Sequence, residues 1–233
     1  MALTGFSTAL RTIPVASPNL HTLKLDFEGW FCGVSRQDMV SSQRGPNSLA
    51  SIINSLRFRS LRIVSIRVNL IEFNDRSDFH PFLDAHPSLE DVSIDLGNKV
   101  LASTALPGLQ SFKGRPLDCV SVCDGRRPLE SLTLSLREPG FDLSFKIKGV
   151  LNDKIVLQRL ASTKTLRRLY LRAKNSNPDE DPEFETQGLC PSLIAQISTA
   201  CPMLTHLELH VEDGIVSIFF LSFPHSHSIT PIC

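Results

Sequence analysis

One short apolar phrase recurs along the chain: an apolar residue, two variable residues, a second apolar residue, one variable residue and a third apolar residue. Its copies begin at Leu20, Leu61, Leu89, Leu109, Leu129, Leu166 and Leu204. The copy at Leu109 is weaker, because Gly114 stands at its third apolar position. Alternation of apolar and polar residues is typical of a strand with one buried face. The pattern therefore predicts seven strands, one for each copy.

The spacing of the copies and the prolines that precede them indicate a repeat. The steps between first leucines are 41, 28, 20, 20, 37 and 38 residues, and leucine-rich repeats run about 20 to 29 residues. A longer step holds either a longer helix or a degenerate copy, and Phe141–Ile147 alternates like one further strand. A proline stands just ahead of five copies: Pro18, Pro87, Pro107, Pro128 and Pro202. Proline ends a helix and donates no ladder hydrogen bond, so it suits the change from helix to strand.

Helix candidates lie between the strands. Residues 47–58 place apolar side chains on one helical face, and residues 191–200 do the same with Pro191 in the first turn. Shorter candidates cover residues 152–160 and 79–85. Strands that alternate with helices connect by right-handed parallel crossovers. The predicted fold class is α/β: a leucine-rich-repeat solenoid over residues 1–213, an incomplete horseshoe with a curved parallel sheet inside and helices outside.

Three phrases resemble the leucine-rich-repeat regions of fungal F-box-type proteins. They are His86-Pro-Ser-Leu-Glu-Asp-Val-Ser-Ile-Asp-Leu-Gly-Asn98, Arg127-Pro-Leu-Glu-Ser-Leu-Thr-Leu134 and Cys201-Pro-Met-Leu-Thr-His-Leu-Glu-Leu209. In that family an N-terminal F-box binds the adaptor of a cullin-type ubiquitin ligase, and the repeats recruit the substrate. The leucine-proline opening and helical hydrophobic run of an F-box are absent here. The resemblance therefore implies only the substrate-recognition role, with a ligase adaptor as partner if the full gene encodes an F-box upstream.

The variable strand positions alternate with the buried ones, so we expect them on the concave face. The candidate partner-binding residues on this face are Arg67, Asp91, Asp95, Lys113, Arg168, Tyr170, Arg172, His206, Glu208 and His210. Arg168, Tyr170 and Arg172 form the strongest row, because Tyr and Arg are enriched at binding hot spots. We expect the acidic pair Asp91 and Asp95 to be partly neutralised by the basic rows on either side. The alternative is a solvated face without a partner.

Candidates for a metal site are weak. His206, Glu208 and His210 share one strand face, but alternate strand residues lie roughly 6.5 to 7 Å apart, which strains chelation of one ion. Cys119 and Cys123 lack the further ligands of a zinc site, which normally has four. We interpret these cysteines as buried thiols, and we expect no metal and no cofactor.

Other motifs point to no chemistry. The acidic run at residues 179–185 is interpreted as a solvated loop, and docking of a basic partner is the alternative. The sequence contains no dinucleotide-binding fingerprint, phosphate-binding loop, nucleophile elbow or zinc-protease motif. We therefore expect a binding protein and no enzyme.

Composition narrows the class of partner. The 233 residues include 33 leucines, which the repeated core explains. Lys and Arg number 24, as do Asp and Glu, so the net charge is zero, whereas binders of nucleic acid or anionic membranes need a basic excess. The longest apolar stretch, residues 215–223, is nine residues long, and a membrane-spanning helix needs about 20. Without a secretory-signal pattern, we expect an intracellular protein, cytoplasmic or nuclear, with a protein partner.

The last 20 residues differ from the rest. Residues 214–233 hold no charged side chain, and the repeat rhythm stops after Leu209. We interpret this segment as an apolar tail outside the fold, arising from a retained intron or a frameshift. The alternative is a genuine terminal strand at residues 215–223. Besides the ligase-receptor role, two functional hypotheses stay open: a free-standing repeat protein without a ligase link, and a non-functional truncated gene product.

Overall fold

A computed structural model of the chain describes residues 2–26, 49–67, 78–94, 96, 100–136, 154–173, 191–211, 214–220 and 229–231. These residues belong to two compact units, Met1–Leu109 and Gln110–Cys233. Each unit is an α/β arrangement of parallel strands and helices. We refer to them as the N-terminal unit and the C-terminal unit.

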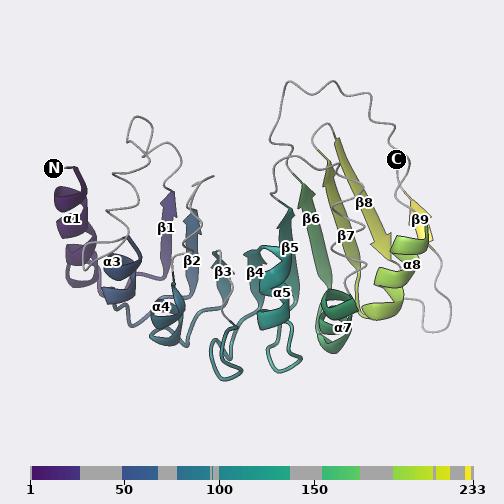
Figure 1. Ribbon diagram of the computed structural model, residues 1–233, viewed down its shortest axis with the longest axis horizontal. Helices are drawn as coiled ribbons and strands as arrows, with labels where there is room; N and C mark the ends of the chain where they lie inside the picture. Colours follow the sequence, from purple (N-terminus) through teal and green to yellow (C-terminus); the bar gives the residue numbers. More distant parts are fainter. Residues whose placement is uncertain are drawn as a thin grey trace. The chain divides into compact units, whose positions relative to one another are not determined.

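The N-terminal unit contains three parallel strands among its described residues. They are β1 (Thr22–Asp26), β2 (Ile63–Arg67) and β3 (Asp91–Ser93). Equivalent positions of the phrase lie side by side, so Leu23 pairs with Val64 and Val64 pairs with Val92. The helices of this unit are α1 (Ala2–Ala16), α3 (Leu49–Ser55) and α4 (His80–Asp84). Helices α3 and α4 lie on one side of the strands, and α1 lies next to α3 (Figure 1).

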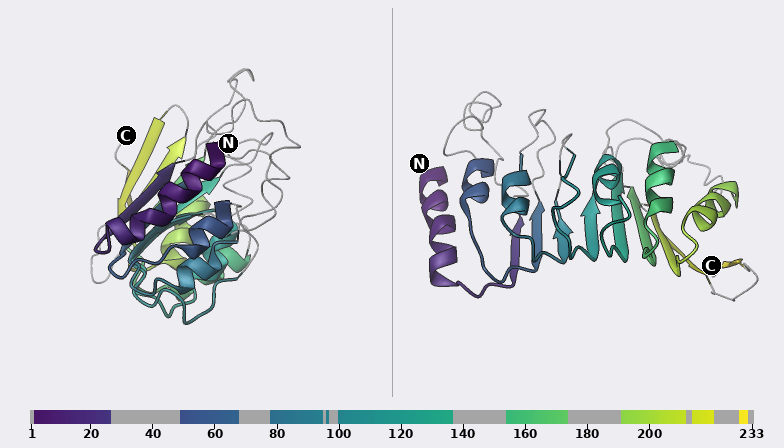
Figure 2. Two further views of the ribbon diagram at one scale, coloured as in Figure 1. Left: turned by 90° about the vertical axis from the view of Figure 1, so that its left-hand side faces the viewer. Right: turned by 90° about the horizontal axis from the view of Figure 1, so that it is seen from below.

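The C-terminal unit continues the same construction. Its parallel strands are β4 (Ser111–Gly114), β5 (Ser131–Leu136), β6 (Arg168–Ala173) and β7 (His206–Val211), each paired with the next in sequence. Its helices are α5 (Pro116–Val122), α7 (Lys154–Ser162) and α8 (Pro191–Ala200). Helix α7 packs between α5 and α8, and the three helices lie on one side of the strands (Figure 2).

A parallel strand begins at the third position of each of the seven phrases, which confirms the seven predicted strands. The second apolar positions are buried in every copy: Leu23, Val64, Val92, Phe112, Leu132, Leu169 and Leu207. The polar residues between them are partly or fully exposed. Removing a leucine-sized side chain from water contributes about 1.5 to 3 kcal/mol, so the alternating pattern determines which strand face packs on the helices.

A recurring backbone contact joins each copy to the next within a unit. The carbonyl of the residue after the first leucine accepts two N–H groups from the following copy, as when Glu130 O accepts from Arg167 N and Arg168 N, each at 2.9 Å. The same pattern occurs at the carbonyls of His21, Arg62, Gln110 and Arg167. Successive copies therefore stack in register through their backbones, independently of side-chain identity.

The four predicted helices occur with small shifts in their ends, and α8 has the predicted bounds Pro191–Ala200. Sequence reasoning missed α1, which carries Pro14 inside the helix, and α5, which has only seven residues. Proline disfavours a helix interior, and the buried polar residues Asp118 and Ser121 interrupt the apolar face by which α5 would be recognised. The predicted extra strand at Phe141–Ile147 lies outside the described residues.

The tail forms strands in this structure. Strand β8 (Gly214–Phe220) pairs antiparallel with β7, and β9 (Ile229–Pro231) pairs antiparallel with β8. This arrangement corresponds to the alternative interpretation of residues 215–223 as a terminal strand. The change from parallel to antiparallel pairing follows from the two-residue connection between β7 and β8, because a parallel neighbour needs a long crossover. The origin of the tail in the gene stays a prediction.

Candidate functional site

The strongest predicted row lies on β6. Arg168, Tyr170 and Arg172 alternate with the buried Leu169 and Leu171. Because successive strand side chains point to opposite faces, the three polar residues share the strand face turned away from the helices. We call them the β6 row.

The register places polar residues on both sides of the β6 row. On β5 the neighbours carry hydroxyl groups: Ser131 lies beside Arg168, Thr133 beside Tyr170 and Ser135 beside Arg172. On β7 the neighbours of the same three residues are His206, Glu208 and His210, respectively. The structure thus brings the predicted residues of β6 and β7 together on one face, next to a row of hydroxyl groups.

Tyr170, His206 and Glu208 form a connected cluster on this face. The rings of Tyr170 and His206 have centroids 5.4 Å apart and are tilted by 54°. His206 Nε2 lies 3.2 Å from Glu208 Oε2. All three side chains are partly exposed. The Tyr170 ring thus packs against His206, which in turn contacts Glu208, on a partly exposed surface.

The two arginines of the β6 row behave differently from this cluster. Arg168 and Arg172 are exposed. Neither guanidinium makes an ion pair or hydrogen bond within the part of the chain that the structure describes. The adjacent β5 positions are uncharged. The surface over β5 and β6 therefore presents two positive charges that no carboxylate of the described residues neutralises.

The predicted residues of the other strands belong to the N-terminal unit, to β4 or to residues outside the description. In the N-terminal unit, Arg67 lies beside Asp26 in the register, with Nη1 3.8 Å from Oδ2. Both groups are half exposed, so the pair contributes at most about 1 kcal/mol. Asp91 begins β3 and Lys113 lies on β4 in the other unit, both partly exposed. Asp95 lies outside the described residues, so the expected neutralisation of the acidic pair stays a prediction.

The cysteines have the chemistry of buried thiols. Cys119 Sγ lies 3.4 Å from Cys123 Sγ without a disulfide, and Cys201 is also buried. The hydrogen bond with Cys123, together with burial, raises the pKa of Cys119 well above its usual value, and burial raises the pKa of Cys201 to about 12. Both groups are therefore poor nucleophiles at neutral pH. Within the described residues, no group of three His, Cys, Asp or Glu side chains is arranged to hold a metal ion.

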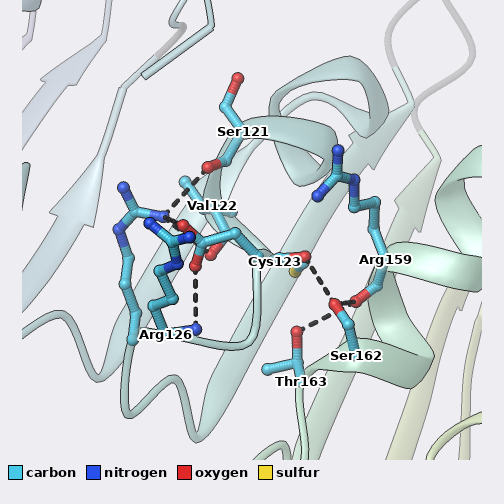
Figure 3. A network of polar contacts seen from close by, with 9 residues as sticks. Ser121, Val122, Cys123, Arg126, Arg159, Ser162 and Thr163 are labelled. Carbon is cyan, nitrogen blue, oxygen red and sulfur yellow. Dashed lines mark hydrogen bonds and ion pairs between the residues drawn. The ribbon is translucent and has the colours of Figure 1, made fainter. Parts of the chain in front are cut away.

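A polar network that sequence reasoning missed joins the ends of α5 and α7. Ser162 Oγ donates to the Cys123 carbonyl at 2.9 Å (Figure 3). Arg127, which is buried, donates from Nη1 to the carbonyl of Ser121 at 3.1 Å and lies 2.9 Å from Asp124 Oδ2. The arginine thus satisfies carbonyls at the end of a helix, which otherwise lack partners. The network has a structural role. Its one indication in the sequence is that Arg127 directly precedes Pro128, one of the prolines that stand ahead of the copies.

Comparisons with known proteins assign the chain to no family. Comparisons with protein-family models, with curated proteins and with solved structures gave no match. Among the described residues, no helix has both the length and the apolar character needed to cross a bilayer.

Proposed function

We propose that the chain is a leucine-rich-repeat protein that binds a protein partner on the strand face centred on the β6 row. We further propose that it serves as the substrate-recognition part of an F-box-type ubiquitin-ligase receptor. The β6 row carries the first proposal: two exposed arginines flank a tyrosine that is held in place by His206. Arg and Tyr are enriched among the residues that dominate binding energy.

The repeated architecture supports a binding role for this face. Strands β5, β6 and β7 are parallel and in register, so their exposed positions form rows with fixed spacing. The backbone of β6 is hydrogen-bonded on both sides, and binding therefore requires little ordering of the main chain. Such preorganisation lowers the entropic cost of association.

The ligase role has a different support, namely the resemblance of residues 86–98, 127–134 and 201–209 to repeats of F-box-type proteins. Affinity purification of the full-length gene product tests it. Recovery of a cullin adaptor together with the chain is the expected result. Its consistent absence, with other partners present, would favour the free-standing binding protein.

A steric block tests the binding face. Thr133 lies beside Tyr170 in the register, so T133W should cover the tyrosine and reduce the proteins that co-purify with the tagged chain. Q158W is the matched control, because Gln158 is an exposed residue of helix α7. Thermal melts of both variants check folding. Equal loss or equal retention of partners in two folded variants would contradict the proposed face.

A further inference from the structure

We propose that the β6 row and the neighbouring hydroxyl row of β5 recognise an extended acidic segment of the partner protein, with two carboxylates four residues apart. The inference rests on the proposed function, because it assigns a chemistry to the partner on the same face.

The charge of the face favours an acidic partner. Arg168 and Arg172 are exposed and form no ion pair with a described residue. Ser131, Thr133 and Ser135 beside them add hydroxyl groups and no carboxylate. Bonds between a guanidinium and a carboxylate are roughly twice as strong as bonds between neutral groups. A carboxylate is therefore a partner group that gains strongly from this surface.

The one carboxylate of the β5, β6 and β7 rows belongs to Glu208 on the β7 side, and its Oε2 lies 3.2 Å from His206 Nε2. An incoming acidic group near β7 would meet the negative charge of Glu208. The positive part of the face consequently lies over β5 and β6. This asymmetry places the acidic segment over these two strands.

The spacing of the arginines defines the spacing of the acidic groups. Arg168 and Arg172 are four residues apart on one strand, which corresponds to roughly 13 Å at the rise of an extended chain. A partner segment in the same extended conformation places the side chains of residues i and i+4 at the same separation. Its middle residue would then meet the Tyr170 ring, which His206 supports at a centroid distance of 5.4 Å.

A peptide series tests this inference on the full chain. The probe is a fluorescein-labelled ten-residue peptide of Ser and Thr with Glu at positions 3 and 7, and binding is followed by fluorescence anisotropy at low salt. Matched peptides carry Gln at both positions, or Glu at positions 3 and 5. We expect the first peptide to bind at least ten-fold more tightly than the Gln peptide and several-fold more tightly than the close-spaced one. Added NaCl should weaken the binding, since exposed ion pairs are screened.

Charge-matched variants locate the site. R168Q and R172Q should each weaken binding of the first peptide several-fold, whereas R159Q, which removes one positive charge from helix α7, should leave it unchanged. Equal binding of the Glu and Gln peptides, insensitivity to R168Q and R172Q, or no binding at millimolar peptide would overturn the inference. Tighter binding of a single-stranded RNA oligonucleotide, lost in the same two variants, would also overturn it.

The natural partner separates this inference from the proposed function. If T133W removes the partner and R168Q/R172Q does not, the binding face stands and its acidic specificity is wrong. If T133W leaves the partner bound, the proposed face is wrong as well. We expect that T133W and R168Q/R172Q both lose the partner and that R159Q binds it as the wild type does.

Discussion

His86 Nε2 accepts a hydrogen bond from the backbone N–H of Phe58 at 3.0 Å, and this contact joins two successive repeats of the N-terminal unit. On the other side of the buried ring, Nδ1 lies 2.6 Å from the carbonyl oxygen of Phe82. Because a carbonyl only accepts, the proton resides on Nδ1 and the ring is neutral. Protonation of Nε2 would remove the acceptor that Phe58 requires.

The first prediction concerns pH. Burial lowers the pKa of His86 below its usual value of 6.5, and the nearby Arg57 acts in the same direction. The unfolded chain therefore takes up a proton at this histidine at higher pH than the folded chain does. The contribution of neutral His86 to the free energy of unfolding is complete above about pH 6.5, and it is lost as the pH falls towards the folded-state pKa. We expect the free energy of unfolding to decrease between pH 7 and pH 5, measured by urea denaturation.

H86Q provides the comparison for this effect. The variant lacks the titrating group, so its stability should change less than that of the wild type over the same pH range. Identical pH profiles for the two proteins would show that His86 does not contribute to the pH dependence.

The second prediction concerns Arg127. R127Q removes the donor to the Ser121 and Val122 carbonyls and leaves the Asp124 carboxylate without its cation. Breaking a buried pair in this way costs about 3 to 5 kcal/mol. The exposed neighbour Arg126 is the matched control, and R126Q should change the free energy of unfolding by less than about 0.5 kcal/mol. Similar denaturation midpoints for the two variants would contradict the structural role of Arg127.

The third prediction compares two glycines. Gly125 has φ +75°, and a Cβ at this position would lie 2.7 Å from the carbonyl oxygen of Ser162, whereas a Cβ at Gly108 has no neighbour within 4 Å. G125A should therefore destabilise the protein by more than about 1 kcal/mol, and G108A should be neutral or slightly stabilising. Thermal denaturation of both variants measures the difference. A stable G125A protein would show that the turn at Gly125 packs differently against Ser162 at the end of α7.

The fourth prediction concerns the thiols. Burial and raised pKa values should protect Cys119 and Cys201 from alkylation by iodoacetamide at pH 8. Mass spectrometry of the digested protein should find both unmodified after labelling of the folded chain and modified after labelling in guanidinium chloride. Rapid labelling of either thiol in the folded chain would contradict the packing around α5 and α8.

The strands were predictable because their cause is local. Each strand is determined by alternating apolar residues that become buried and, in five copies, by a proline just before the phrase. These features lie within a few positions of the strand, so Leu169 and its equivalents identified all seven parallel strands. The contacts of His86 and Arg127 were not predictable in the same way. Each depends on a turn that brings a side chain to a carbonyl or an N–H of another segment, and sequence periodicity contains no such information.

The candidate site was predictable only in part. Alternation placed Arg168, Tyr170 and Arg172 on one face of their strand and predicted the same for His206 and Glu208 on the next. The register then set the two rows side by side. The ring contact of Tyr170 with His206 joins β6 and β7, and the pairing of His206 with Glu208 lies within β7. Both depend on side-chain conformations, which alternation along a strand does not determine. Likewise, the pairing of Arg67 with Asp26 follows from the register of β1 and β2, which lie 37 residues apart in the sequence.

The central claim is that a protein partner binds the strand face over β6. Photo-crosslinking tests it most directly, with p-benzoylphenylalanine introduced in place of Tyr170 and, in a second protein, in place of Gln158 on helix α7. Both chains are irradiated with the proteins that co-purify with the wild type, and crosslinked bands are identified by mass spectrometry. We predict a crosslinked partner from position 170 and none from position 158. A partner crosslinked from position 158 alone would contradict the claim.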